Sequence, residues 1–457
     1  LCTINILAKE NVIDKFNKNH MFVVNRKDGL GERLRSILNV ILLSQITGGK
    51  SRFTWKSIPS HQRVFHSFST KENIFNEEFI EKNIIDESTI NTMQLIPLLE
   101  VDHATEVDNF DAVLVSQNLL HTQFSDKSLI TRLDYKGAYE SIGFSDRIVT
   151  AQILAKEIIE KNRTVSIHLR AGDIVYGVHR ITNSCVPKVV PAYIASLLID
   201  YFKELDYQVI VFGQDEDFCK GICKDKGVLY SQDLCNPRFS EDQKAIFDIT
   251  LMSKSELIVA GKSGFSTLAG LVGDVSVKYF DHFLSYTEVI QAFYDAINES
   301  GTLNRDFTSP LMKSYSIMHF LIMYGDHLNV DYKIKLIKFC KKLDEKNTFI
   351  QIMKSVYLFE NGGYSESELE ILELFSPNLD YNIYWLVRDN KLNYFLKPIR
   401  FCAENGSAVF AAILLMCNVH NSTDIDIKFY EDILLKTHNH EVGWNLLNNE
   451  IEKIKGL

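Results

Sequence analysis

The sequence has no hydrophobic run long enough to cross a membrane. Its longest wholly apolar stretch, Ala408–Cys417, is about half of the roughly 20 residues that a spanning helix needs. This length excludes a membrane-spanning helix in the segment but leaves docking on a membrane surface open. No secretory signal opens the chain and its first residue is not Met, so we expect the natural N-terminus to lie further upstream.

Paired cysteines are also lacking. The chain has 8 cysteines, none of them in a CxxC pair, and no histidine stands at zinc-like spacing from a cysteine pair. A disulfide framework is typical of small secreted chains, whereas scattered thiols in a long chain predict reduced cysteines. We therefore expect a cytoplasmic protein without a structural zinc.

An excess of basic residues is absent as well. The 49 Lys and Arg residues are outnumbered by 59 Asp and Glu residues, which gives a net charge of −10. Such a balance excludes general nucleic-acid binding, which needs a concentrated basic surface. It does not exclude a local basic pocket for a phosphate group. With 46% hydrophobic residues over 457 positions, the chain has room for two or three globular domains.

Residues 1–150 are expected to form a Rossmann-like α/β lobe. Short β-type runs alternate here with a long segment of helical periodicity, 34–46. The predicted strands are Met21–Asn25, Arg52–Trp55 and Asp111–Ser116. A glycine turn, Asp28–Gly31, separates the first strand from the helix.

Residues 151–305 alternate strand and helix more regularly and predict a second Rossmann-like lobe. Runs rich in Val and Ile that are separated by helices are typical of a parallel sheet covered on both faces. Ligands of such sheets bind at the carboxyl ends of the strands. The predicted strands are Thr164–Leu169, Gln208–Phe212, Gly227–Tyr230, Glu256–Ala260 and Val275–Tyr279.

Residues 306–457 have helical periodicity and almost no strand signal, so we expect an all-helical domain. Short helices joined by Asn, Gly and Ser turns indicate either an antiparallel bundle or a solenoid, and no fixed repeat period chooses between them. The domain has no phosphate loop, which favours a docking or structural role towards a protein partner, a membrane surface or an acceptor. Its aromatic residues are either surface contacts or core: Tyr381, Tyr384, Trp385, Tyr394 and Phe395.

The strongest local motif ends the first strand of the second region, at His168-Leu-Arg170-Ala-Gly-Asp173. Period-two alternation puts His168 and Arg170 on one face of the strand. The planar guanidinium of Arg170 can pair with two phosphate oxygens at once, and Asp173 can orient it or contact a substrate. The alternative is a salt bridge at the strand end beside a core histidine.

A second motif follows the strand that ends at Ala260. A strand, then glycines and hydroxyl residues, then a helix builds an anion site from loop amides, hydroxyls and the helix N-terminus. It lacks the GxxxxGK[ST] order of a P-loop, and the alternative is an ordinary helix cap. Its residues are Gly261, Ser263, Gly264, Ser266 and Thr267.

Together, His168-x-Arg170-x-x-Asp173 and the downstream Asp248 and Ser263-Gly264-Phe-Ser266 resemble the fucosyltransferase superfamily. That group includes the nodulation, core N-glycan and protein O-fucosyltransferases, and the resemblance covers about residues 160–275. It implies a GT-B-like fold in which residues 151–305 bind GDP-fucose and residues 1–150 face the acceptor. It also implies transfer with inversion and without a metal.

The same resemblance implies roles for the donor-binding residues. Arg170 would grip the β-phosphate, and His168 and Asp248 would face the guanine and ribose. The pyrophosphate would be held by the serine-rich turn, at Ser263, Gly264, Ser266 and Thr267.

The glycine turn of the first region, with Gly29 and Gly31, looks like the one that opens the first lobe in these families. An Asn commonly follows the second glycine there, and this chain has Glu32 instead. The turn amides and Arg33 or Arg35 are expected to face the cleft, and the alternative is a structural turn with a solvated first helical turn.

Two DxD strings, Asp215-Glu-Asp217 and Asp424-Ile-Asp426, are rival motifs, because such strings hold a divalent metal in another glycosyltransferase fold. They stand among other acidic residues, which are usually solvated, so we expect no metal and no other cofactor.

The catalytic candidates follow from the charge that grows on the leaving diphosphate, which Arg170 and the serine-rich turn would stabilise. For the general base the candidates are Glu32, Asp173 and His179, and the sequence does not choose among them. Alternatives are a transferase of the same fold with another nucleotide sugar, or a non-catalytic carbohydrate- or nucleotide-binding protein. The richness in Ile, Asn and Lys favours an AT-rich bacterial genome, and hence surface-polysaccharide synthesis in the cytoplasm or at the inner face of the plasma membrane.

Overall fold

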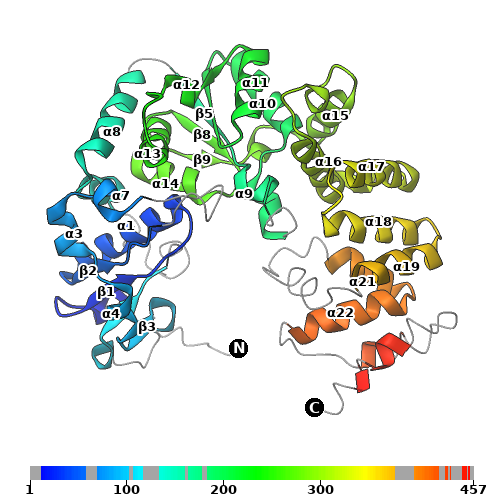
Figure 1. The fold of residues 1–457 in the computed structure, drawn as a ribbon, viewed down its shortest axis with the longest axis horizontal. Helices are drawn as coiled ribbons and strands as arrows, with labels where there is room; N and C mark the ends of the chain where they lie inside the picture. The colour runs from blue at the N-terminus through cyan, green and yellow to red at the C-terminus, as the bar shows by residue number, and fades with distance from the viewer. Residues whose placement is uncertain are drawn as a thin grey trace, which may run out of the picture. The chain divides into compact units, whose positions relative to one another are not determined.

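The computed structural model describes residues 12–57, 69–101, 107–116, 133–159, 163–177, 183–375 and 396–420, with short stretches at 428–430, 433, 445–449 and 451–452. The chain divides into two compact units, whose helices and strands are labelled in Figure 1. The first consists of Leu1–His168, Phe202–Phe212 and Gly227–Tyr279, and the second of Leu169–Tyr201, Gly213–Lys226 and Phe280–Leu457.

A four-stranded sheet opens the first unit, in the order β2-β1-β4-β3. Its neighbouring strands are parallel, with Phe22 of β1 opposite Ser51 of β2 and Val113 of β4. Three of the four β1 residues are buried, as expected for a parallel strand covered on both faces. The elements are β1 Met21–Val24, α1 Leu30–Thr47, β2 Lys50–Phe53, α2 Lys71–Ile74, α3 Glu77–Asn83, α4 Glu87–Asn91, β3 Leu95–Pro97, β4 Ala112–Leu114, α7 Tyr135–Glu140 and α8 Asp146–Ile158.

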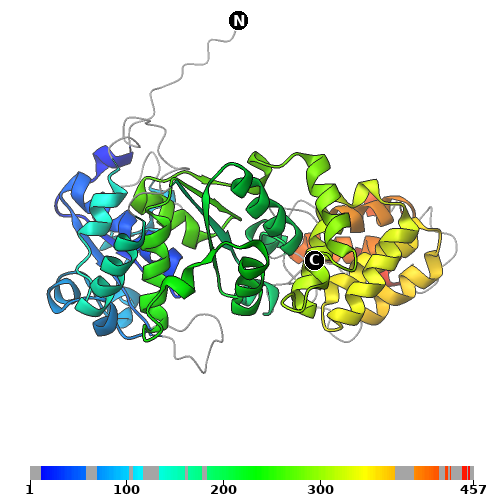
Figure 2. The same ribbon diagram turned by 90° about the horizontal axis from the view of Figure 1, so that it is seen from above.

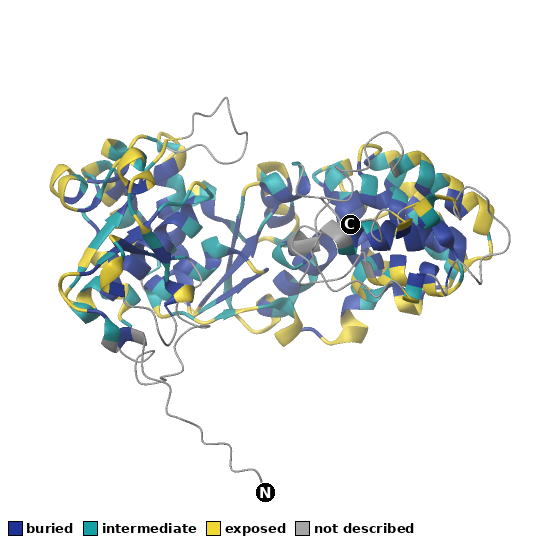
Figure 3. Ribbon diagram, turned by 90° about the horizontal axis from the view of Figure 1, so that it is seen from below, coloured by how far each residue is buried: buried dark blue, intermediate teal, exposed yellow. Residues whose placement is uncertain are grey.

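A five-stranded sheet follows, in the order β7-β6-β5-β8-β9. Its central strand β5 is buried along its whole length, and β5 pairs with β8 in parallel so that His168 stands opposite Ala260. Figure 3 draws the strands at the centre of this sheet as buried, with exposed residues on the outer faces of the helices. The elements are β5 Thr164–Leu169, β6 Gln208–Gly213, β7 Leu229–Tyr230, α12 Ser231–Leu234, α13 Glu241–Met252, β8 Leu257–Ala260, α14 Gly264–Gly273 and β9 Val277–Lys278.

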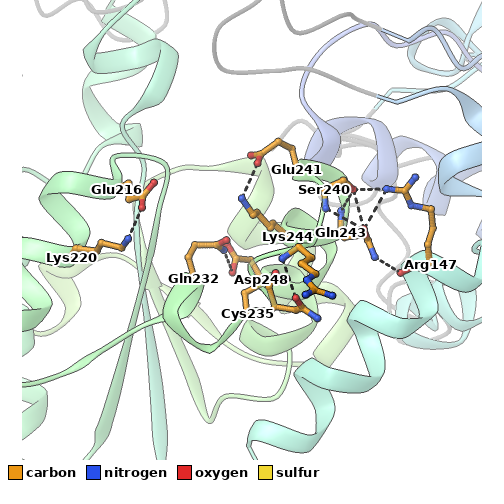
Figure 4. A network of polar contacts seen from close by, with 12 residues as sticks. Arg147, Glu216, Lys220, Gln232, Cys235, Ser240, Glu241, Gln243, Lys244 and Asp248 are labelled. Carbon is orange, nitrogen blue, oxygen red and sulfur yellow. Dashed lines mark hydrogen bonds and ion pairs between the residues drawn. The ribbon is translucent and has the colours of Figure 1, made fainter.

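Arg147 on α8 ties these parts of the first unit together. Its guanidinium donates to the Asn73 side chain at 2.9 Å and to Ser240 Oγ at 2.8 Å. Ser240 also begins α13 with a capping box that Gln243 completes, and Gln243 Nε2 donates to the Arg147 carbonyl at 2.9 Å (Figure 4). These charge-assisted bonds join α8 to α2 and to the start of α13 within the first unit.

Apart from Leu169 and Gly213, which end β5 and β6, the regular elements described in the second unit are helices. Its helices are α9 Gly172–Val175, α10 Ala192–Glu204 (which continues past the unit boundary), α11 Glu216–Lys226, α15 Tyr286–Ile297, α16 Pro310–Tyr324, α17 Val330–Leu343, α18 Thr348–Glu360, α19 Tyr364–Phe375, α21 Leu396–Glu404 and α22 Ala408–His420. From α16 to α19 each helix packs on the next, and Figure 2 shows these helices side by side.

Two of its helical hairpins have the same construction. Gly362 follows α18 and Gly406 follows α21, both with left-handed backbone (φ 79° and 100°), which favours glycine after a helix. The hairpins α18–α19 and α21–α22 also stack like on like, since α18 packs on α21 and α19 on α22. Stacked hairpins are the building plan of a solenoid, so the solenoid alternative fits this part of the chain better than a simple bundle.

The start of the helical region shares a core with α10. Tyr193 of α10 bonds His319 of α16 at 3.2 Å, and Phe293 of α15 stacks on Phe320 with ring centroids 3.6 Å apart. Burial lowers the pKa of His319 to about 3, so the histidine is neutral at physiological pH. This cluster is core, as expected for aromatics at helical spacing.

The predicted fold class, an α/β chain with two parallel sheets followed by helices, is confirmed. The strand predicted at 52–55 begins two residues earlier, and β3 was not predicted. The predicted domain boundaries at 150 and 305 stay predictions. Among the described residues, no helix combines the length and the apolar character needed to cross a membrane.

Candidate functional site

The glycine turn leads from β1 into α1 at the carboxyl edge of the four-stranded sheet. Gly29 caps α1 with extended backbone, and Arg33 holds the turn in place. The guanidinium of Arg33, only 2% exposed, donates from Nε to the Asp28 carbonyl at 2.8 Å and from Nη1 to the Lys56 carbonyl at 2.7 Å. Arg33 and Arg35 were predicted to face a cleft. The guanidinium of Arg33 instead bonds backbone carbonyls.

The N-termini of α1 and α14 touch through their backbones. A Cβ atom added to Gly31 would lie 2.8 Å from Phe265 Cα and 2.9 Å from Phe265 N, closer than carbon atoms approach without repulsion. Only glycine fits at this contact. The glycine turn of the first sheet and the serine-rich turn of the second, which are far apart in sequence, are thus brought together within the first unit.

The Glu32 carboxylate lies at this junction. A Cβ atom added to Gly264 would overlap Glu32 Oε1, so the carboxylate sits against the first residue of α14. Negative charge is favoured at a helix N-terminus. Arg35 Nη1 donates to the same carboxylate at 3.1 Å, and the two side chains are 13% and 29% exposed. A carboxylate therefore lies where a phosphate was predicted, with a guanidinium beside it.

The hydroxyls of the serine-rich turn point back into the helix. Ser266 Oγ and Thr267 Oγ1 donate to the Ser263 carbonyl, at 3.1 and 2.8 Å, and Ser266 is fully buried. Ser263 is the N-cap residue but makes no side-chain cap bond. Both hydroxyls therefore donate their protons within the protein and not to a ligand. The donors that remain for an anion are the backbone amides at the start of α14, as at other helix N-termini.

His168 reaches the same place from β5. Its side chain is 4% exposed, and its ring lies 5.6 Å from the ring of Phe265, centroid to centroid. Phe265 therefore contacts both His168 and Gly31. Phe265 was part of the sequence motif, but nothing in the sequence predicted that its ring would contact His168 and its backbone Gly31. The first unit thus brings together Gly29, Gly31, Glu32, His168, Ser263 and Gly264.

Asp248 of α13 lies beside α12, which follows β7. Gln232 Nε2 donates to Asp248 Oδ1 at 2.8 Å (Figure 4). Burial raises the pKa of Asp248 to about 7, against the lowering effect of the neighbouring Ser231 and Gln232 side chains. Burial and the charge of Asp248 also raise the pKa of the Cys235 thiol to about 11. An acid whose pKa lies near neutral can hold a proton and donate it to a ligand.

Arg170 and Asp173 belong to the second unit, which the chain enters at Leu169. Arg170 Nη2 donates to Asp173 Oδ1 in a partly buried ion pair, with side chains 17% and 22% exposed. Gly172 between them has left-handed backbone (φ 43°) at the start of α9. The Asp173 carboxylate, three residues after Arg170, therefore holds the guanidinium in place. This ion pair is compatible with both predictions, a phosphate-binding arginine oriented by Asp173 and a structural salt bridge at the strand end.

Asp215 of the first DxD string caps α11. Its Oδ1 accepts from the Phe218 amide at 3.1 Å, and it also accepts from the hydroxyl of Tyr176. Burial raises the pKa of Asp215. Its carboxylate is thus used within the protein. In the described residues no three His, Cys, Asp or Glu side chains are grouped as a metal site. His179, Asp424, Asp426 and the aromatics of 381–395 lie outside those residues.

No protein-family model matches the sequence, and no curated protein matches it. The structure is similar to several solved structures. The fucosyltransferase NodZ from Bradyrhizobium is 13% identical, with a TM-score of 0.36 over 59% of this chain and 98% of NodZ. POFUT1 in complex with GDP is 11% identical, with 0.34 over 58% and 99%. Arabidopsis thaliana FUT1 in complex with GDP is 13% identical, with 0.35 over 59% and 72%.

NodZ is a fucosyltransferase. The resemblance drawn from the sequence motifs names the same family. At these identities and TM-scores the likeness assigns no residue, so the roles of residues rest on this chain's own geometry. Each comparison also leaves about two fifths of the chain without a counterpart.

Proposed function

We propose that the chain is an inverting glycosyltransferase that moves a sugar to a glycan acceptor. The leading candidate for the sugar is fucose, with GDP-fucose as the donor. The observation that carries the proposal is the junction of α1 and α14. There two glycine-containing turns, each following a parallel strand, meet around Glu32, and His168 joins them through Phe265. Parallel α/β sheets bind their ligands at such strand ends.

The donor diphosphate would bind at the amides at the start of α14. The sequence motif gives Arg170 the role of a bidentate partner for phosphate oxygens. As the bond to the sugar breaks, negative charge grows on the leaving diphosphate, and fixed donors stabilise that charge most. Asp173 would keep the guanidinium oriented. Glu32, Asp173 and His179 remain the candidates for the base that takes the acceptor proton.

The partly buried acid Asp248 supports a nucleotide site. A protonated carboxyl is both a donor and an acceptor, which suits the edge of a purine base. GDP-fucose is the first donor to test. We further propose a metal-independent enzyme of surface-polysaccharide synthesis that acts in the cytoplasm or at the inner face of the membrane.

A thermal-shift screen with GDP, UDP, CDP, CMP and dTDP tests the proposal, since a ligand that binds the folded state raises its melting temperature. We expect GDP to give the largest shift in melting temperature. We then expect the protein to turn over GDP-fucose in the presence of acceptor glycans. A shift with another nucleotide would identify a transferase with a different donor. A shift without turnover of any donor would favour a non-catalytic binding protein, and no shift at all would refute the proposal.

A further inference from the structure

A pocket lies in the first unit, at the carboxyl end of β2. This β2 pocket has a volume of about 350 Å³ and is lined by residues 54–57, 70–72 and 84–87. It is the size of a small ligand site, for which about 300–1,000 Å³ is typical. We propose that the β2 pocket binds a neutral, hydroxyl-rich saccharide, the acceptor of the transfer. The role as acceptor site rests on the proposed function, whereas saccharide binding itself does not.

Trp55 provides the apolar wall of the pocket. Its indole Nε1 donates to the Ser69 carbonyl at 3.1 Å, its ring packs edge-on against Phe75 at 5.0 Å, and Arg33 Cζ lies 5.2 Å from the ring centroid. The side chain is nevertheless partly exposed. A large aromatic ring held in place offers contact area at low entropic cost, which is what the C–H face of a sugar ring needs.

The polar wall of the pocket carries charges of both signs. Glu72, Asp86 and Glu87 line it, against Lys56 and Lys71. Backbone and Thr70 hydrogen bonds lower the pKa of Glu72, and the bond from Lys27 lowers that of Glu87, so both are ionised at neutral pH. Asp86 stands at the N-cap of α4 but makes no side-chain cap bond.

Ionised carboxylates only accept hydrogen bonds, so a matching ligand must donate them. Sugar hydroxyls do so, whereas a phosphate, sulfate or uronate would meet three carboxylates, which Lys56, Lys71 and the Lys27 that bonds Glu87 only balance. With no excess of positive charge at the pocket, a neutral saccharide is favoured over an anionic one.

The pocket is linked to the candidate donor site through two consecutive residues of α1. Arg33 bonds the Lys56 carbonyl and packs on Trp55, both of which line the pocket. The residue before it, Glu32, lies against Gly264 of the serine-rich turn. Acceptor and donor sites of a transferase must be neighbours, and the β2 pocket meets this condition within the first unit.

Intrinsic fluorescence tests saccharide binding without turnover. The sequence has 3 tryptophans, so replacing Trp385 and Trp444 with Phe leaves Trp55 as the only reporter. We expect saturable fluorescence changes with at least one neutral trisaccharide from a panel of glucose, galactose, mannose and N-acetylglucosamine oligomers. Trigalacturonate should give a dissociation constant at least tenfold higher. A panel without response, or an equal response to trigalacturonate, would overturn the proposal.

Three variants locate the binding site. Trp55→Ala should raise the saccharide dissociation constant at least tenfold by calorimetry, Trp55→Phe less, and the exposed Asp86→Asn about threefold. Melting temperatures show whether Trp55→Ala still folds. If Trp55→Ala is unfolded, the saccharide affinity of Asp86→Asn tests the site instead. Unchanged saccharide affinity in Asp86→Asn and Trp55→Phe would overturn the assignment. GDP binding, measured in parallel, should stay as in the wild type. If the wild-type protein itself does not bind GDP, the proposed function is refuted but the saccharide site is not.

Discussion

Replacing Gly31 with Ala should push α1 and α14 apart. The new Cβ would lie 2.8 Å from Phe265 Cα, which is about 1 Å inside the favourable carbon–carbon distance. Because the opposing atoms are backbone, no side-chain rotation relieves the overlap. Overpacking of this kind costs about 1–3 kcal/mol. For a unit of roughly 200 residues, this corresponds to a fall in melting temperature of about 2–12 °C.

Gly264→Ala should behave differently, because its new Cβ would meet the Glu32 carboxylate, the far end of a side chain. In a Glu32→Ala background that obstacle is gone, so Gly264→Ala should then cost almost nothing. Gly31→Ala should cost the same in both backgrounds. The double-mutant cycle therefore predicts a coupling energy for the pair Glu32 and Gly264, and a much smaller one for the pair Glu32 and Gly31.

The assay is urea unfolding of the single and double variants, with GDP binding measured by calorimetry. Gly325→Ala is the matched control, since a Cβ there would have 3.8 Å to its nearest neighbour, Tyr357 Oη, and should change neither quantity. A Gly31→Ala protein with wild-type stability and GDP affinity would refute the backbone contact and with it the junction that carries the proposed function.

Four further predictions concern charge. Glu32→Gln should bind GDP about tenfold more tightly, a change of about 1.4 kcal/mol, because a like charge leaves the N-terminus of α14; calorimetry measures it, and weaker binding would contradict the placement. Arg170→Ala should abolish turnover at an unchanged melting temperature, and Arg170→Lys should rescue it poorly, since an ammonium lacks the planar fork. The pKa of Asp248 is raised to about 7, so its protonated form stabilises the fold below about pH 4 and this contribution is lost as the pH rises to 7. Asp248→Asn should lack that part of the pH dependence in thermal melts. Finally, activity should survive EDTA, and loss on chelation with recovery on adding manganese would favour a metal-dependent enzyme.

The strand ends were predictable from the sequence because their pattern is local. Each strand of the five-stranded sheet appears as a Val- and Ile-rich run, and the motif at His168 and the turn at Ser263 were placed at the carboxyl ends of β5 and β8, where the structure has them. Period and turn chemistry depend on neighbouring residues alone.

The contacts made at those strand ends were not predictable, because they join residues far apart in the chain. Nothing near Arg33 indicates that its guanidinium bonds the Lys56 carbonyl, and nothing near Glu32 indicates Gly264 as its neighbour. The hydroxyls of Ser266 and Thr267 were expected to face a ligand, but they bond the Ser263 carbonyl, which satisfies the backbone of their own turn. The hairpin repeat escaped notice because its two copies share a glycine and little else.

The route of the chain between its compact units has a practical consequence. The backbone changes unit five times, after residues 168, 201, 212, 226 and 279. No single proteolytic cut can therefore release one unit from the other, since each is assembled from three separate stretches. A nick at one boundary should leave the fragments together on gel filtration and separate them only in denaturant. Swapping the helical region between relatives would also have to carry along α9, α11 and most of α10, because these helices belong to the same unit.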